Sequence, residues 1–231
     1  MVRVRRSEER GHADHGWLEA RHSFSFANYY DTDWIGFRSL RVLNEAVIHA
    51  GKGFGTHPHR DMEIVTVVLE GALTHEDSMG FSATLTPGIV QRMSAGTGIT
   101  HSEMNLSDAP VHLFQTWIMP DRAGHEPRYE DRPFDLEARR NRLRLIVSPD
   151  GRDGSLDVHQ DVCIYDAELA DGAEVTHALG DARHAWVQVA DGSVSVNGEP
   201  LEAGDAAAVS EEAALLIAAT DDAEFLLFDF A

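Results

Sequence analysis

Two short stretches of the chain carry residues whose types and spacing suit metal binding. His57 and His59 are two residues apart in the first stretch, and His101 and Glu103 repeat that spacing in the second. Successive side chains of an extended strand alternate between its two faces, so each pair points to one side of its strand. If the two strands meet on one wall of a sheet, three imidazoles and one carboxylate converge on a point. Such a ligand set suits Fe, Ni, Cu, Zn or Mn.

Both pairs stand in sequence that is typical of strands which bend sharply and then enter a core. Apolar, strand-like segments follow them at 64–69 and 111–119. The preceding glycines are Gly51, Gly53 and Gly55 for the first pair and Gly96 and Gly98 for the second. Because glycine tolerates tight bends and close backbone approach, it allows the two strands to come together. This context favours a metal site over a chance spacing of polar residues.

The rest of the chain predicts an all-β protein. Short apolar segments alternate with turn signals at 70–71, 79–80 and 86–88. Strands at this spacing are typical of antiparallel sandwiches and barrels. Residues 120–142 are charged, poor in aliphatic side chains and interrupted by prolines. This composition indicates a linker, with one helical turn expected around 135–140.

The C-terminal part of the chain repeats the pattern of the N-terminal part without its chemistry. Residues 184–210 parallel residues 63–94. Where a second metal-binding pair would fall, residues 213–220 are all apolar or small. The predicted domains are an N-terminal metal-binding barrel at 1–132, a linker at 133–142 and a C-terminal barrel without a metal site at 143–231.

Two cupin motifs coincide with the two pairs. The pattern Gly-x5-His-x-His-x3-Glu is matched by Gly51, His57, His59 and Glu63, and Gly-x2-His-x3-Asn is matched by Gly98, His101 and Asn105. The stretches 21–31, 56–71, 75–80 and 93–105 resemble the pirin family, and the likeness extends over essentially the whole chain. The resemblance implies a bicupin, in which two cupin-type antiparallel β-barrels are joined by a short linker. The metal ligands it implies are His57, His59, His101 and Glu103. Glu63 is a ligand in many other cupins but not in pirins.

Several bacterial pirins that resemble this chain are described as quercetin 2,3-dioxygenases. In that reaction the 3-hydroxyl group of the flavonol loses its proton, dioxygen adds across the heterocycle, and carbon monoxide is released. The resemblance makes Glu103 the candidate catalytic base as well as a ligand. The preferred metal is Fe(II), although the ligand types leave Ni, Cu, Mn and Zn open. Candidate walls for a flat aromatic substrate are Phe54, Met93 and Trp117.

Two other hypotheses stay open on the sequence. In the first, the protein is a non-enzymatic regulator whose metal and oxidation state shape a surface for protein partners. Eukaryotic pirins, which the chain also resembles, are described as iron-dependent transcriptional co-regulators. In the second, the metal only stabilises the barrel. A cavity that reaches the metal and is wide enough for a three-ring flavonol favours the enzyme, whereas a sealed metal favours the regulator.

The composition excludes some classes of partner. The formal net charge of the chain is −20. Residues 143–231 carry 3 basic and 19 acidic side chains, so this part alone accounts for −16. A surface of that sign repels phosphate backbones, and we expect no direct binding to nucleic acid.

The same composition predicts a soluble cytoplasmic protein that does not associate with membranes. No uncharged apolar run is long enough to span a bilayer. The single cysteine, Cys163, cannot form an internal disulfide, which is typical of a reducing compartment. Cys163 lies in an apolar run and is expected to be a buried core thiol.

Overall fold

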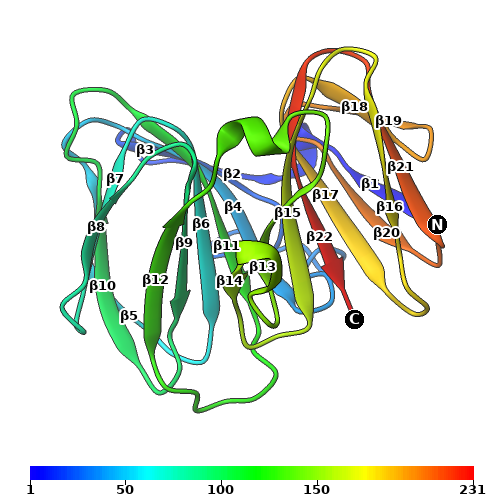
Figure 1. Cartoon of the computed structure of the whole chain (residues 1–231). Coiled ribbons are helices and arrows are strands. Elements are labelled where there is room, and N and C mark those ends of the chain that lie inside the picture. The colour runs from blue at the N-terminus through cyan, green and yellow to red at the C-terminus, as the bar shows by residue number, and fades with distance from the viewer. The chain divides into compact units, whose positions relative to one another are not determined.

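The computed structural model describes residues 1–231 and consists almost entirely of β-strands (Figure 1). Its helical elements are the 3-10 turns η1 (Ser7–Glu9), η2 (Leu136–Arg139) and η3 (Arg152–Gly154). None of these helices has the length and apolar character needed to cross a membrane. The chain divides into two compact units, and each unit is built from one seven-stranded and one four-stranded sheet.

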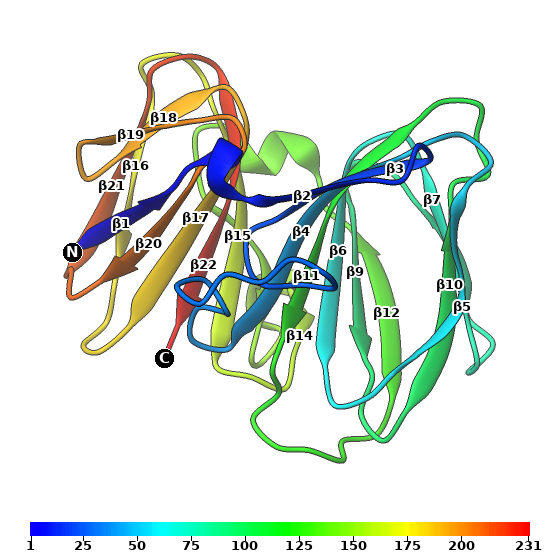
Figure 2. The same ribbon diagram turned by 180° about the vertical axis from the view of Figure 1, so that it is seen from behind.

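The N-terminal unit consists of Gly11–Phe134 and Val158–Gln160. Its seven-stranded sheet holds, in spatial order, β12 (Arg128–Pro133), β9 (Ile89–Ser94), β6 (Glu63–Glu70), β11 (Val111–Ile118), β4 (Leu40–Ile48), β3 (Leu18–His22) and β2 (Gly11–Asp14). Its four-stranded sheet holds β5 (Gly53–His59), β10 (Ile99–Met104), β7 (Leu73–Asp77) and β8 (Ser82–Leu85). The two sheets face each other across the interior of the unit, as Figures 1 and 2 show from opposite sides.

Alternation of apolar and polar side chains explains why these sheets pack face to face. In β11, Val111 and Leu113 belong to the core between the sheets, while His112 is only partly buried. Leu73 of β7 and Leu85 of β8 reach the same core from the opposite sheet. Burial of apolar surface on both inner faces is the main favourable contribution to such a sandwich. A polar side chain on these faces therefore needs a partner or a ligand.

Strand β10 lies between β5 and β7 and aligns the residues that can do chemistry. His101 pairs with His57 of β5 on one side and with Asp77 of β7 on the other. The register of β5 and β10 shifts between His101 and Glu103, so that Glu103 pairs with Phe54. This β-bulge places two residues of β5 opposite one residue of β10. As a result Phe54 and His57, three positions apart, both line the interior of the unit.

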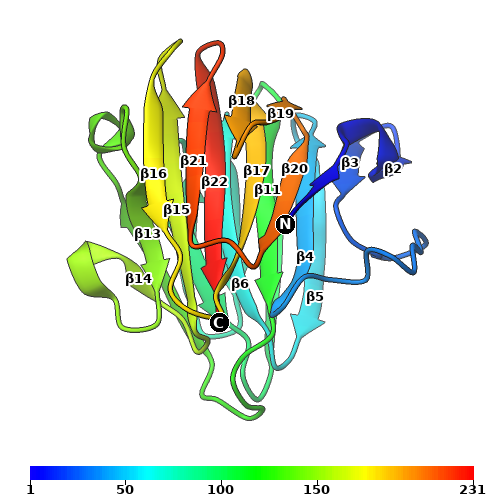
Figure 3. The ribbon, with the colours of Figure 1, turned by 90° about the vertical axis from the view of Figure 1, so that its right-hand side faces the viewer.

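The C-terminal unit consists of Met1–Arg10, Asp135–Asp157 and Asp161–Ala231. Its seven-stranded sheet holds, in spatial order, β1 (Val2–Arg5), β20 (Ala206–Ser210), β17 (His184–Asp191), β22 (Ala223–Phe230), β15 (Val162–Leu169), β13 (Arg144–Ser148) and β14 (Leu156–Asp157). Its four-stranded sheet holds β16 (Glu174–Ala178), β21 (Ala214–Ala219), β18 (Ser193–Val196) and β19 (Glu199–Glu202). Figure 3 shows β16 and β21 side by side in this unit.

The four-stranded sheets of the two units share one strand order but differ in the chemistry of their inner faces. In the C-terminal unit, His177 of β16 pairs with Leu215 of β21. The equivalent pair in β5 and β10 is His57 and His101. Leu215 and the next inward-facing residue of β21, Ile217, are fully buried in an apolar core. Hydrophobic packing therefore fills the space that polar groups occupy in the N-terminal unit.

The prediction of an all-β protein with two cupin-type halves is confirmed, with one refinement. Each half is a pair of facing sheets rather than one closed barrel. The helical turn expected around 135–140 is present as η2. The buried position expected for Cys163 is also observed, and the Arg152 side chain donates to its Sγ at 3.0 Å.

The domain bounds 1–132, 133–142 and 143–231 stay a prediction, and the structure differs from them at the start of the chain. β1 pairs in antiparallel fashion with β20, and Arg6 Nη1 donates to Asp205 Oδ2 at 2.7 Å. Residues 1–10 thus belong to the C-terminal unit, because β1 completes the edge of its larger sheet.

Candidate metal centre

The histidines of the two predicted pairs lie together on the inner face of the four-stranded sheet of the N-terminal unit. The ring centres of His57 and His101 are 4.5 Å apart, and each lies 4.8 Å from that of His59. One ligand atom from each of the three rings lies within 4.8 Å of those of the other two. Glu103 forms a second such group with His101 and His75. His101 therefore joins both groups.

The free atoms of these side chains fit a divalent cation. His101 Nε2 and Glu103 Oε1 are buried and have no hydrogen-bond partner. A buried polar atom left unpaired costs about 1–3 kcal/mol, a cost that a bound cation removes. His57 Nδ1 lies 2.8 Å from the carbonyl oxygen of Gly55, to which it donates, so its Nε2 is left for a ligand. The imidazole and carboxylate donors match those that transition metals take in proteins.

Burial sets the protonation of the cluster. It lowers the pKa of His59 from 6.5 to about 4, with a smaller contribution from the charge of His57. Burial, together with the neighbouring imidazoles, lowers the pKa of His101 to about 2. Both rings are therefore neutral at pH 7, which is the form that binds metals. Burial raises the pKa of Glu103 from 4.5 to about 7, and the hydrogen bond from Gln115 opposes this shift.

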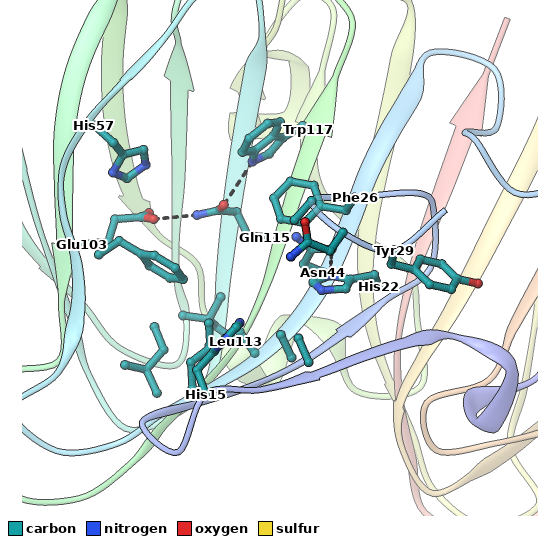
Figure 4. Close-up of a pocket in the computed structure, with 18 of the residues that line it drawn as sticks. His15, His22, Phe26, Tyr29, Asn44, His57, Glu103, Leu113, Gln115 and Trp117 are labelled. Atoms are coloured by element: carbon teal, nitrogen blue, oxygen red, sulfur yellow. Dashed lines mark hydrogen bonds between the residues drawn. The ribbon is translucent and has the colours of Figure 1, made fainter. Parts of the chain in front are cut away.

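Gln115 of β11 holds the Glu103 carboxylate from the opposite sheet. Its Nε2 donates to Glu103 Oε2 at 2.7 Å, and its Oε1 accepts from Trp117 Nε1 at 3.0 Å (Figure 4). The bond from Trp117 fixes which end of the Gln115 amide faces Glu103. One carboxylate oxygen is thereby engaged while Oε1 stays free.

A cavity of about 530 Å³ lies beside the cluster and is lined by His57, His59 and Glu103. This volume is within the roughly 300–1,000 Å³ typical of small-molecule sites. Leu18, Ile48 and Leu113 contribute an apolar wall (cavity residues are shown in Figure 4). The wall of β3 and β4 also carries a polar pair, in which His22 Nδ1 and Asn44 Oδ1 are 2.7 Å apart.

Of the three side chains that were predicted to form the walls of a substrate cavity, two line this cavity. Phe54 and Trp117 do so, and the Trp117 ring packs edge-on against His59 with ring centres 4.8 Å apart. Met93 does not, because it is fully buried in a core cluster with Ile64 and Ile99.

Glu63 points away from the cluster. Its neighbour Ile64 faces the core, so Glu63 faces the other side of the seven-stranded sheet. There Ser94 Oγ donates to Glu63 Oε2 at 2.7 Å, and His159 Nδ1 lies 3.1 Å from Oε1. The conspicuous carboxylate of the first motif is thus engaged elsewhere.

Sequence reasoning missed several residues that surround the cluster. Gln115 is the one polar residue among the inward-facing positions of β11, between Leu113 and Trp117, and this isolated amide was a usable signal. The His22–Asn44 pair had no such signal, because its partners are 22 residues apart and meet only through the pairing of β3 and β4.

The fold and the histidine cluster together define a protein of the cupin class. The family model described as pirin matches residues 2–118, and the model described as the quercetinase C-terminal cupin domain matches residues 145–230. The chain belongs to the pirin family.

Relatives and solved structures agree with this assignment. The chain is 50% identical over 230 residues to a quercetin 2,3-dioxygenase of Escherichia coli, which covers 99% of this chain and 98% of the relative. It is 40% identical over 232 residues to a pirin-like protein of Caulobacter vibrioides, with full coverage of both chains. The crystal structure of the bacterial pirin YhhW from Escherichia coli in complex with nickel(II) superposes with a TM-score of 0.95 at 49% identity, covering 100% of this chain and 99% of that one.

These findings bear on the cofactor and the class of protein. The family match, the nickel(II) complex of a relative and the donor cluster support a divalent metal as the cofactor. The names of the relatives support the prediction that the chain is an oxidoreductase. The preference for Fe(II) stays a prediction.

Proposed function

We propose that the protein is a metal-dependent dioxygenase that cleaves flavonols such as quercetin with dioxygen. In this proposal the metal is held by His57, His59, His101 and Glu103. The observation that carries the proposal is the cavity, because it is lined by three of these four residues and its volume suits a three-ring ligand. The names of the 50% identical relatives support the choice of substrate.

The chain's own residues would bind the substrate and take up its proton. A divalent metal, when bound, supplies Lewis-acid activation of an oxygen ligand and electron transfer to dioxygen. The flat rings of the flavonol would lie against Phe54 and Trp117, while the apolar wall excludes water from the reacting oxygen. The flavonol's 3-hydroxyl group would donate its proton to Glu103 Oε1, which would release the cation in order to accept it.

The environment of Glu103 suits a general base. Without a metal, burial raises the pKa of Glu103 to about 7, whereas a bound cation would favour the ionised carboxylate, which is the form that accepts a proton. The hydrogen bond from Gln115 keeps the carboxylate in one orientation during that exchange. Gln115 is therefore a positioning residue in this proposal.

Quercetin consumption in air tests the proposal. Metal-free protein is reloaded with Fe(II), Ni(II), Cu(II) or Mn(II), and loss of the flavonol absorbance band is followed with and without oxygen. We expect oxygen-dependent loss with at least one metal and none with metal-free protein. The metal content of Glu103→Gln is measured first. Its rate of quercetin consumption per bound metal should then be far below that of the wild type. If the flavonol absorbance band stays unchanged with every metal, the regulator hypothesis is favoured. It would be favoured even though that hypothesis predicted a metal sealed away from any cavity.

A further inference from the structure

A second layer of polar residues lies behind the histidine cluster and has no role in the proposed dioxygenase mechanism. His75 and Asp77 of β7 belong to the stretch 75–80 that the sequence analysis singled out. β7 pairs with β10 so that His75 lies opposite Glu103 and Asp77 lies opposite His101. The side chains of His75 and Asp77 are completely buried.

These residues form a chain of polar contacts that ends on His101. His101 Nδ1 and His75 Nδ1 are 3.3 Å apart, and His75 Nε2 and Asp77 Oδ2 are also 3.3 Å apart. Tyr129 of β12 stacks on His75 with ring centres 4.6 Å apart and an interplanar angle of 19°. The stacking restrains the His75 ring, so both of its nitrogens keep their partners.

The chemistry of the last acceptor decides where each hydrogen lies. A carboxylate only accepts, so His75 Nε2 carries the hydrogen that faces Asp77. In a neutral imidazole the other nitrogen then has a lone pair, and His75 Nδ1 accepts from His101 Nδ1. His101 Nε2 is left with a lone pair, and this is the buried atom without a hydrogen-bond partner. The opposite arrangement would bury an N–H at His101 Nε2 with no acceptor.

We propose that Asp77 and His75 form a positioning relay that fixes His101 as the tautomer whose Nε2 can bind the metal. The inference rests on the proposed metal site. A backbone carbonyl, which only accepts, does the same for His57. His101 differs because its partner is another imidazole, which can donate or accept, so its tautomer is decided at Asp77. Partners of this kind orient metal-binding histidines and raise their basicity.

Asp77 offers a substitution that reverses the relay without changing its shape. Asp77 Oδ1 accepts from the backbone N–H groups of Met79 at 2.9 Å and Phe81 at 3.1 Å. In Asp77→Asn these two donors hold the amide oxygen at that position, so the NH2 group faces His75 Nε2. His75 must then carry its hydrogen on Nδ1, and His101 must carry its hydrogen on Nε2. A protonated nitrogen cannot bind a metal.

The experiment measures nickel(II) affinity and histidine tautomers in the full-length chain. We expect Asp77→Asn to weaken nickel(II) binding by about 10- to 100-fold in chelator competition. Glu76→Gln is the matched control, because it removes the same charge from the adjacent exposed residue and should leave the affinity unchanged. Nitrogen-15 NMR of the metal-free proteins should show a hydrogen on His101 Nδ1 in the wild type and on Nε2 in Asp77→Asn.

Several outcomes would overturn the relay. A hydrogen on His101 Nε2 in the metal-free wild type contradicts it directly, even if Asp77→Asn does not fold. Weaker nickel(II) binding in Asp77→Asn with an unchanged His101 tautomer would make Asp77 merely structural. Neither readout uses quercetin, so loss of flavonol cleavage and failure of the relay are distinguishable.

Discussion

At the scale of single residues, the centre depends on which atoms are already engaged. Gln115 occupies Glu103 Oε2, and Gly55 occupies His57 Nδ1, which leaves Oε1 and Nε2 to face a ligand. Buried polar atoms are normally paired, so an unpaired atom such as His101 Nε2 indicates a missing partner. His101 belongs both to the group of three histidines and to the group that contains Glu103, and this arrangement supports the proposed cation site.

The raised pKa of Glu103 predicts a pH-dependent stability of the metal-free protein. The folded state holds the proton up to about pH 7, whereas the unfolded chain releases it near pH 4.5. The stability from this group is therefore present below pH 4.5 and is lost as the pH rises through 7. The difference between these pKa values corresponds to about 3 kcal/mol.

The comparison with Glu103→Gln isolates this effect, because the lowered pKa values of His59 and His101 are common to both proteins. Relative to the wild type, the free energy of unfolding of metal-free Glu103→Gln should rise by about 3 kcal/mol between pH 4.5 and pH 8. Urea denaturation at several pH values measures it. A difference that stays constant with pH would contradict the raised pKa.

From the position of Asn44 in the cavity wall, we predict that the protein prefers hydroxylated substrates. Its Oδ1 is engaged by His22, and its side chain makes no other hydrogen bond, so the NH2 group is available to a ligand in the cavity. We expect Asn44→Leu to raise KM for quercetin by about 2- to 10-fold, because one hydrogen bond worth about 0.5–1.5 kcal/mol is lost. The KM for a flavonol whose only hydroxyl is the 3-hydroxyl group should not change. Equal changes for both substrates would remove Asn44 from recognition.

At the scale of elements, the close pairing of β5 and β10 positions the cluster. A Cβ atom on Gly53 would lie 2.2 Å from the backbone oxygen of Glu103 and 2.7 Å from Met104 Cα. Because both atoms belong to the backbone, neither can move aside without separating the strands. The bulge that follows then turns Phe54 and His57 to the same face.

Two glycines of this strand provide a matched test. Gly53→Ala should destabilise the protein by about 1–3 kcal/mol and weaken metal binding, because the strands must move apart. Gly55→Ala should be tolerated, since nothing lies within 4 Å of the added Cβ. Urea denaturation and metal titration of both variants measure the effect. Similar behaviour of the two variants would mean that the close approach at Gly53 is not required.

At the scale of the whole molecule, one architecture occurs twice and carries two different interiors. Both units have a seven-stranded and a four-stranded sheet in the same arrangement. Both groups of side chains that can hold a metal lie in the N-terminal unit, at the places taken by Leu215 and Ile217 in the other. In the C-terminal unit His177 bonds to Asp229, with Nε2 and Oδ2 2.8 Å apart. That histidine is already satisfied.

Because the side chains that can hold a metal lie in the N-terminal unit alone, we predict one metal ion per chain. Elemental analysis of purified protein should give about one divalent metal, which His101→Ala loses and His177→Ala keeps. The physical reason is that His101 supplies a free buried nitrogen, whereas His177 is engaged by Asp229. Retention of full metal content in His101→Ala would contradict the proposed site.

The sequence by itself determined the strand pattern, the two cupin-type halves and the first metal-binding candidates. These follow from local rules, because alternation along a strand and the glycines before His57 and His101 are properties of neighbouring residues. Only the tertiary structure decided that Glu63 faces away, that Met93 is core and that residues 1–10 complete the C-terminal sheet. It also brought Gln115, Asn44 and the Asp77–His75 pair to the centre. Register between distant strands makes these contacts, and no local pattern encodes that register.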